Sequence, residues 1–198
     1  MKTRPLTSFA YAVTTVMSAT VLSATAVLAA EPQASMVAFV DSSVRVWFAE
    51  PAVQAAITAS NAAHAGLDNA QILDLDTRWR AEIGRADAPT VSRVTGSALS
   101  EQLRERVADS GGTITEIILM DNRGLNVAVS AVTSDYWQGD EAKFQQTFPL
   151  GAGAVHVGEI EFDESTQTYQ AQVSVVIVDA ASGAPIGAAT VGLNAEAF

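Results

Sequence analysis

The spacing of the hydrophobic positions changes near the middle of the chain. Up to residue 110 the apolar residues recur every three or four positions, which is the period of one helical face. The first such stripe comprises Val37, Val40, Val44, Trp47 and Phe48. Pro51 suits the first position of a helix and opens a continuation that runs to Gly66. The pattern predicts a long, possibly kinked N-terminal helix whose stripe can lie on a sheet or pair with a copy of itself.

Two shorter helical patterns follow. Residues 70–83 carry apolar positions that end with Trp79 and Ile83, and residues 86–89, which include Pro89, break this helix. Leu99, Leu103 and Val107 mark a further helix, and the adjacent Gly111 and Gly112 end it.

Beyond Gly112 the chain takes on the character of a sheet. Dense β-branched and apolar segments alternate with short polar turns, and the turn at residues 121–124 indicates a hairpin. Tight turns favour antiparallel neighbours. The predicted strands are residues 114–120, 125–129, 154–162, 168–178 and 186–193. We therefore expect one α+β domain, with a long N-terminal helix and short helices packed on a five-stranded, largely antiparallel sheet.

The N-terminus predicts export. Lys2 and Arg4 are the only charges before Glu31, and residues 8–30 form an uncharged run that ends in small residues. A basic start, an apolar run and small residues are typical of a signal peptide, with cleavage after Ala29 or Ala30. An uncleaved anchor is the alternative, because the run is long enough to span a bilayer. Its many small and hydroxylated residues favour cleavage. We expect residues 31–198 to form a single domain that is periplasmic or secreted.

Charge and cysteine content remove several classes of function. The predicted mature chain has nine basic against 22 acidic residues, a net charge of −13. Such acidity argues against nucleic acid and anionic lipid as partners. The chain has no cysteine and only two histidines, His64 and His156. Disulfides, thiol catalysis and a multi-histidine metal centre are thereby excluded. We expect neither a cofactor nor a metal.

Residues 135–144 combine aromatic and acidic side chains in a connection between strands. This stretch, DYWQGDEAKF, places Tyr136, Trp137 and three carboxylates close together. Large aromatics in a loop pack on a sheet, cover a cavity or meet a partner. The segment is therefore a candidate for the roof of a small-molecule site.

Two hairpin sequences resemble a known family. Residues 115–121 (TEIILMD) with 124–128 (GLNVA) are similar to the first hairpin of Cache-type extracytoplasmic sensor domains, the PAS-like ligand-binding modules of bacterial receptors. Residues 178–187 (VDAASGAPIG) resemble their final hairpin. Asp-x-x-Gly alone is a general turn signature. The order and spacing of the motifs carry the resemblance, which covers residues 37–193.

The resemblance implies a ligand cavity on the sheet face opposite the long helix. Residues 131–154, which connect the second and third strands, would roof it. Amino-acid-binding members often carry an Arg shortly before a Trp here, and it grips a carboxylate. This chain has Ser134, Asp135 and Tyr136 before Trp137, so the resemblance favours an amine, cation or neutral ligand. Receptors place the domain between membrane spans, whereas this sequence resembles a free-standing member with no second span or output domain.

Several residues are candidates for ligand contact, each with an ordinary structural alternative. Tyr136 and Trp137 either cover a ligand or seal the sheet as core. Asp135 and Asp140 could meet a cationic group, although Asp140 also suits the N-cap of a helix that runs to Phe148. Lys143 either contacts an anion or lies on a solvated helix face.

Three further candidates lie in or near the same region. Arg80 could reach the pocket or pair with Asp76. Trp79 beside it is most simply core. Ser130 could hydrogen-bond a ligand, although turn chemistry is its ordinary role.

These patterns predict a non-enzymatic exported domain that senses or binds a small solute. The alternatives are a protein-interaction module that dimerises through the N-terminal helix or binds a membrane receptor, and a hydrolase that uses His156. Neither a Gly-x-Ser-x-Gly elbow nor a phosphate-binding glycine loop is present in the sequence. Sequence alone gives His64 the role of a favourable partner for a helix end.

Overall fold

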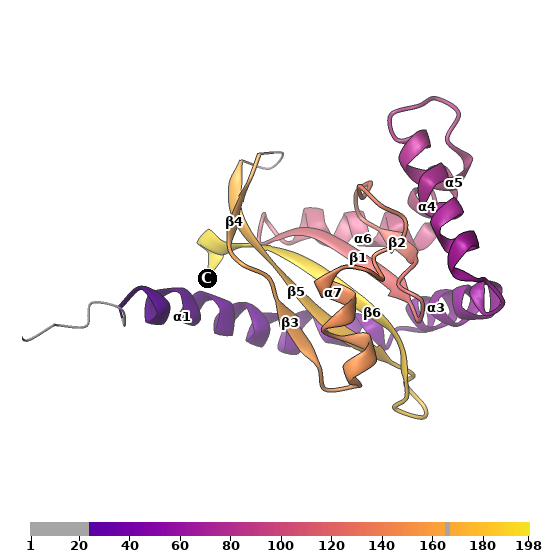
Figure 1. The fold of residues 1–198 in the computed structure, drawn as a ribbon. Helices are drawn as coiled ribbons and strands as arrows, with labels where there is room; N and C mark the ends of the chain where they lie inside the picture. The colour runs from indigo at the N-terminus through magenta and orange to yellow at the C-terminus, as the bar shows by residue number, and fades with distance from the viewer. Residues whose placement is uncertain (1–23, 165–166) are drawn as a thin grey trace, which may run out of the picture.

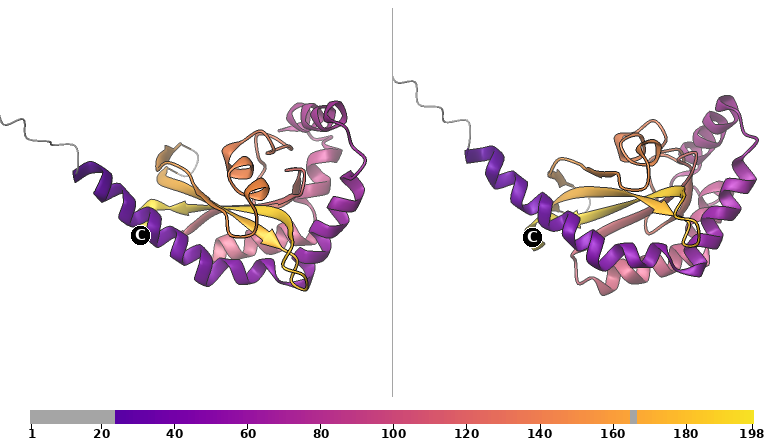
Figure 2. Two further views of the ribbon diagram at one scale, coloured as in Figure 1. Left: turned by 60° about the horizontal axis from the view of Figure 1, so that its bottom comes forward. Right: turned by 90° about the horizontal axis from the view of Figure 1, so that it is seen from below.

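A computed structural model describes residues 24–164 and 167–198, and it confirms the expected α+β class. Figures 1 and 2 show one antiparallel sheet with the long N-terminal helix and a second helix on one face. The connection that carries α7 covers the opposite face, and two further helices rise at one end.

The predicted N-terminal helix is present as a chain of helical segments. These are α1 (Ala24–Phe39), the π-helical segment η1 (Val40–Val44), α2 (Arg45–Phe48) and α3 (Pro51–His64). Pro51 stands in the first turn of α3, after Glu50 in an extended conformation. Met36, Val40 and Val44 are fully buried, so the stripe lies on the sheet as its period indicates.

Three helices link this segment to the sheet. They are α4 (Asn69–Glu82), α5 (Pro89–Thr95) and α6 (Ala98–Asp109). Asp68 and Gln71 form a reciprocal capping box at the start of α4. The sequence pattern missed α5, where Pro89 begins a helix instead of only ending one.

Glu82, the last residue of α4, caps the start of α5. Its oxygens accept hydrogen bonds from the N–H groups of Thr90 (2.6 Å) and Val91 (3.0 Å) and from the Thr90 hydroxyl (2.8 Å). Burial raises the pKa of Glu82, but these hydrogen bonds and the charge of Arg93 outweigh burial, and the net pKa is lowered. Glu82 therefore supplies the cap that Ala88 cannot provide.

The sheet is wholly antiparallel. Its strands are β1 (Ile114–Asp121), β2 (Asn126–Val129), β3 (Val155–Val157), β4 (Glu161–Asp163), β5 (Thr168–Val178) and β6 (Pro185–Asn194). The order is β2-β1-β6-β5-β3, and β4 pairs with the far end of β5. The prediction of a single strand at residues 154–162 is wrong in detail. It divides at residues 158–160 into two short strands that both pair with β5.

The two faces of the sheet carry separate hydrophobic clusters. Ile117, Val175 and Val191 pack with α1–α3 and α6. Ile118 and Met120 face the other way and pack with α4, α5, Tyr136 and Phe144. The period-two alternation of the strands thus places the connection over the face that the resemblance implied.

Part of the export prediction lies outside the described residues. Residues 1–23, which hold much of the predicted signal peptide, are outside the described residues. Helix α1 (Ala24–Phe39) includes the expected cleavage positions Ala29 and Ala30. Signal-peptide cleavage stays a prediction. Within the described residues, helices that combine the length and apolar character needed to cross a membrane are absent.

The close contact between β6 and β1 gives a direct test of the fold. A Cβ at Gly187 would lie 2.2 Å from the carbonyl oxygen of Met120 and 3.2 Å from Ile57 Cγ2. We expect Gly187→Ala to lower the free energy of unfolding by about 1–3 kcal/mol, because the backbone must move apart. Gly153→Ala is the control, since a Cβ there meets nothing within 4 Å. Urea unfolding that gives the two variants equal stability would contradict this packing.

Candidate ligand-binding site

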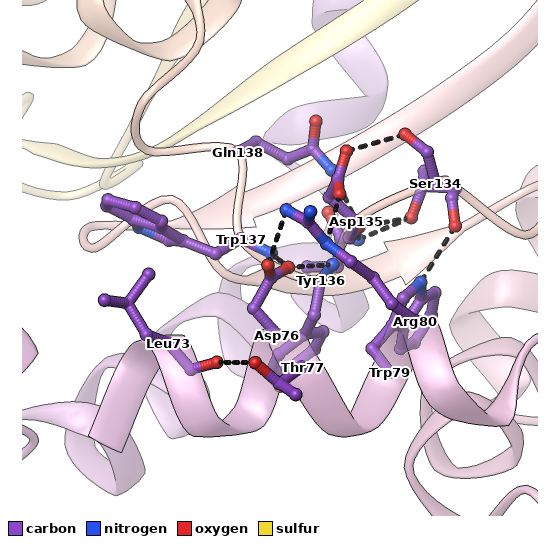
Figure 3. Close-up of polar contacts among 12 residues, drawn as sticks. Leu73, Asp76, Thr77, Trp79, Arg80, Ser134, Asp135, Tyr136, Trp137 and Gln138 are labelled. Atoms are coloured by element: carbon purple, nitrogen blue, oxygen red, sulfur yellow. Dashed lines mark hydrogen bonds and ion pairs between the residues drawn. The ribbon is translucent and has the colours of Figure 1, made fainter. Parts of the chain in front are cut away.

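A buried carboxylate on α4 holds the connection between β2 and β3 in place. Asp76 Oδ1 accepts hydrogen bonds from the backbone N–H groups of Tyr136 (2.9 Å) and Trp137 (3.1 Å). Its Oδ2 pairs with Arg80 Nη2 at 2.7 Å. Asp76 is only 4% exposed, and Figure 3 shows it between the helix and the loop. The two aromatic residues are therefore held by a helix that precedes them by some 60 positions.

Arg80 bridges the helix and the loop. Besides Asp76, its guanidinium contacts Asp135 Oδ1 through Nε at 2.7 Å (Figure 3). The Asp135 carbonyl accepts from Asn126 Nδ2 and Gln138 Nε2. Arg80 and Asp135, both predicted ligand residues, thus neutralise each other in this structure.

The two aromatic residues of the connection have different surroundings. Tyr136 is buried and stacks on Trp79, with ring centroids 5.4 Å apart and planes inclined by 22°. Trp79 is fully buried, and its indole N–H donates to Thr133 O at 2.8 Å. Trp137 is half-buried and donates to Arg123 O at 2.8 Å. Trp79 and Trp137 therefore serve the packing of the connection.

The remaining predicted residues lie apart from the aromatic pair or support the chain locally. Ser130 Oγ accepts from the N–H of Ile117 (2.8 Å) and extends the β1–β2 pairing. Lys143 Nζ pairs with Glu141 at 3.0 Å. Asp140 is exposed. The expected N-cap at Asp140 is wrong, because α7 (Ala142–Gln145) starts one residue later, after Glu141, and makes no side-chain cap.

A cavity of about 380 Å³ lies where α3, α5 and β2 meet Tyr136. Small side chains form much of its wall, among them Ala56, Ala59 and Ala63 of α3. Its polar lining comes from four separate parts of the chain: Ser60 and His64 on α3, Arg93 on α5, Asn126 on β2, and Tyr136. Convergence of polar groups around a concave surface is typical of a small-molecule site.

Asp121, the last residue of β1, contacts Ser60 and His64, the polar α3 side chains that line the cavity. Asp121 Oδ2 accepts from Ser60 Oγ (2.9 Å) and contacts His64 Nδ1 at 2.6 Å. Its Oδ1 accepts from the N–H groups of Arg123 (2.9 Å) and Leu125 (3.0 Å). Because the aspartate and the serine both meet the imidazole at Nδ1, the geometry is not that of a serine hydrolase, in which they meet opposite ring nitrogens. The cluster positions Ser60 and His64 instead.

Asn126 ties β2 to the connection. It is 1% exposed, and its Nδ2 donates to Thr133 Oγ1 (2.8 Å) and Asp135 O (2.9 Å). Asp135 O is a carbonyl oxygen that can only accept, so the reversed amide would place two acceptors against each other, and this fixes the orientation. Asn126 Oδ1 then has no partner within the described part of the chain. A buried acceptor without a partner is costly, and because Oδ1 exposes less than 1 Å², this cost belongs to the packing of β2 against the connection.

Two charges of opposite sign act on Tyr136. Burial raises the pKa of its phenol, while Arg93 lowers it and Asp121 raises it, and the net pKa is raised. The phenol therefore stays neutral across the physiological range and can both donate and accept a hydrogen bond.

Of the eight predicted ligand residues, Tyr136 is the one that lines this cavity. A ligand role for the other seven stays a prediction. Sequence reasoning missed Arg93 because it missed α5. It took His64 for a helix-end partner, although the spacing of Ser60 and His64 already places them on one helical face. His156 lies on β3, away from this cluster.

A second hollow lies beside the projecting β4–β5 pair. It has a volume of about 480 Å³ and is lined by Glu159, Glu161, Asp163 and Gln170 among others. Within residues 24–164 and 167–198, no cluster of three or more metal-ligating side chains occurs.

Comparison with known proteins found distant structural neighbours. No family model matches the chain, and no curated protein matches its sequence. Among solved structures, the ligand-binding domain of the Campylobacter jejuni chemoreceptor Tlp3 in complex with L-valine is 13% identical, with a TM-score of 0.38. The match covers 86% of this chain and 58% of that one.

Two further neighbours have similar values. The ligand-binding domain of the Pseudomonas aeruginosa amino acid chemoreceptor PctC, in complex with GABA, is 11% identical with a TM-score of 0.37, and the match covers 86% of this chain and 59% of that one. The V. cholerae histidine kinase DctB sensor domain is 11% identical with a TM-score of 0.34, and the match covers 84% and 57%. The structural neighbours are thus sensory domains of chemoreceptors and histidine kinases. This chain spans less than two thirds of the length of each of these sensory domains.

Removal of the Asp76 carboxylate tests how the connection is held. We expect Asp76→Ala to cost about 3 kcal/mol in the free energy of unfolding, because two buried N–H groups lose their acceptor. Asp74→Ala is a matched control, since Asp74 also pairs with an arginine four residues later but is exposed. Its cost should stay below about 1 kcal/mol. Equal losses in urea titrations of the two variants would refute the anchoring role.

The raised pKa of Tyr136 predicts a dependence of stability on alkaline pH. The folded state holds the phenol proton more tightly than the unfolded state does. The resulting stability is complete below the unfolded pKa of about 10 and is lost as the pH rises through the folded pKa. We expect Tyr136→Phe to reduce this alkaline loss in denaturant titrations, whereas Tyr169→Phe, at an exposed tyrosine, leaves it unchanged. An identical alkaline profile for the wild type and Tyr136→Phe would refute the shift.

Proposed function

We propose that the chain is a non-enzymatic, exported domain that senses or binds a small solute in the cavity beside Tyr136. The observation that carries the proposal is the convergence of polar side chains from α3, α5, β2 and the connection, namely Ser60, His64, Arg93, Asn126 and Tyr136, around one concave surface. The volume of the cavity falls in the range of small-molecule sites.

The surroundings of the cavity suit a sensor. Helix α3 continues the N-terminal helical segment, and its Ser60 and His64 line the cavity while they contact Asp121 of the sheet. Tyr136 links the cavity to the connection that Asp76 and Arg80 hold. A bound solute would therefore touch the helix, the sheet and the connection at once. We propose that occupancy shifts how the long helix packs on a homodimer partner or a membrane receptor.

The ligand class and the compartment extend this proposal. The absence of an Arg directly before Trp137 favours an amine, cation or neutral solute over a simple carboxylate. The N-terminal sequence favours release into the periplasm or the medium after cleavage near Ala29 or Ala30. Both expectations stay predictions.

Blocking the cavity tests the function. In thermal-shift and titration-calorimetry screens against amines, amino acids, sugars and organic acids, we expect at least one solute to raise the melting temperature of the wild type. Ala59→Phe should abolish that binding, because Ala59 lines the cavity and a phenyl ring there would occupy it.

Ala55→Phe is the matched control. Ala55 is exposed on the same helix and does not line the cavity, so the variant should bind as the wild type does. Failure of every solute class to bind the wild type would overturn the proposed function. Binding that survives Ala59→Phe unchanged would remove this cavity as the site.

A further inference from the structure

We infer that the outer edge of β4 binds a short extended segment of a partner protein, in which basic and apolar residues alternate. The segment adds a strand beside β4, with its basic side chains toward the acidic hollow and its apolar side chains on the aromatic pair Phe162 and Tyr169. This surface is separate from the cavity beside Tyr136, so the inference goes beyond the proposed function and does not rest on solute binding.

The two edges of the sheet differ in what covers them. At the β2 edge the connection supplies a partner, since Asn126 N donates to Tyr136 O at 3.0 Å. Gln138 N donates to Gly124 O at 2.8 Å beside it. At the opposite edge, β4 pairs with β5 alone among the strands of the described chain, and Figure 1 shows it at the projecting end of β5. An unpaired edge presents backbone N–H and C=O groups to a further strand.

The aromatic pair at this edge is exposed, although both rings are large. Phe162 of β4 is 49% exposed and Tyr169 of β5 is 52% exposed. They lie opposite each other in the register, with ring centroids 5.3 Å apart. Tyr169 shares a face of β5 with Ala171 and Val173, which are buried in the cluster that packs on the N-terminal helical segment. The pair therefore continues that hydrophobic face beyond the part that is covered.

The other face of the β4–β5 pair is acidic. Alternation along the strands places Glu161 and Gln170 on the face opposite the aromatic pair. The charged side chains that line the hollow of about 480 Å³ are Glu159, Glu161 and Asp163. Glu159 and Glu161 are exposed, and neither has a hydrogen bond or an ion pair with a described residue. The sequence after Lys143 contains neither lysine nor arginine, so strands β3–β6 bring no cation to this hollow.

These two faces set the pattern of the partner segment. Strand β4 is three residues long, so backbone pairing is limited and side chains must add affinity. In an extended segment, successive side chains point to opposite faces. Side chains on the face of Phe162 are therefore apolar, and those on the face of Glu161 are basic.

Charge also decides between a partner protein and a second copy of this chain. Pairing of two β4 edges about a twofold axis would bring the carboxylates of Glu161 and its neighbours in both copies close together. Like charges on neighbouring strands destabilise their pairing. The chain has 22 acidic against 11 basic residues, which adds repulsion at longer range. A basic segment of another protein is attracted by the same charges.

The bound segment would lie beside the N-terminal helical segment. Between β3 and β4, the Gln33 side chain of α1 donates from Nε2 to Gly158 O at 3.2 Å. Ile160 packs against the same hydrophobic cluster as α1. The partner would therefore contact the chain next to the helix that begins the domain.

Fluorescence anisotropy with labelled hexapeptides at low ionic strength tests the inference on the full chain. The basic probe is Lys-Val-Lys-Val-Lys-Phe, and the acidic probe has glutamate in place of each lysine. The third probe is the basic peptide N-methylated at three consecutive residues, which blocks both of its edges because successive N–H groups point to opposite sides. We expect the basic probe to bind at least tenfold more tightly than either of the other two.

A charge-reversal variant locates the site. Glu161→Lys should weaken binding of the basic peptide about tenfold, because attraction in the hollow becomes repulsion. Asp87→Lys is the matched control, since Asp87 is exposed between α4 and α5 and does not line the hollow. It makes the same change of charge and should leave binding within about twofold of the wild type.

An aromatic variant tests the apolar face. Phe162→Ser should weaken binding of the basic peptide about tenfold, because the valine side chains lose the ring on which they pack. Leu73→Ser is the control, since Leu73 on α4 is 52% exposed and does not line the hollow. The four substituted residues are all exposed, so the variants should fold.

The outcomes separate the added strand from simpler contacts. Equal binding of the basic and the N-methylated peptides would overturn strand addition. Equal losses in Glu161→Lys and Asp87→Lys would leave only general charge attraction and overturn the site. Light scattering that shows self-association, abolished by Phe162→Ser, would assign the edge to a second copy instead. Absence of binding by the basic peptide would overturn the inference outright.

The proposed function is tested independently of this edge. Ala59→Phe blocks the cavity beside Tyr136 and should leave peptide binding unchanged. Glu161→Lys should in turn leave solute binding unchanged, because Glu161 does not line that cavity. Loss of peptide binding in Ala59→Phe would overturn the separation of the two surfaces.

Discussion

The structure around the cavity depends on the complete satisfaction of one buried carboxylate. Asp121 sits at the end of β1 and receives donors from α3 and from its own hairpin turn. A buried charge is tolerated only when it is paired and hydrogen-bonded, so these donors cannot leave without a large cost. The end of α3 is therefore held against the sheet, and with it the wall of the cavity.

A second buried carboxylate, Asp76, holds the connection between β2 and β3 in place. It fixes the backbone of Tyr136 and Trp137 against α4, while Arg80 balances its charge and that of Asp135. The backbone N–H groups of Tyr136 and Trp137 and the carboxylate of Asp135 are therefore already paired where the connection meets the cavity. Arg93 and Tyr136 line the cavity with polar side chains that neither anchor uses.

Most of the fold could be predicted because its elements follow local rules. The buried stripe of the N-terminal helix, the Pro51 start of α3 and the limits of β5 all appear as patterns of spacing and turn residues. The errors fell where tertiary contacts replace local signals. Helix α5 takes its cap from Glu82 of another helix. Strands β3 and β4 are separate because the four steps from Val157 to Glu161 lie against only three on β5, from Val173 to Gln170, which breaks the register.

The sequence by itself determined the α+β class, the sheet with its helix behind it, and the aromatic connection, because side-chain periodicity and turn chemistry are local properties. Only the tertiary structure decided which of these residues surround a cavity. Ser60, Arg93 and Tyr136 are far apart along the chain and meet through long-range contacts that no spacing encodes. It also decided which charges remain available, since an ion pair such as Arg80 with Asp135 joins residues from different elements.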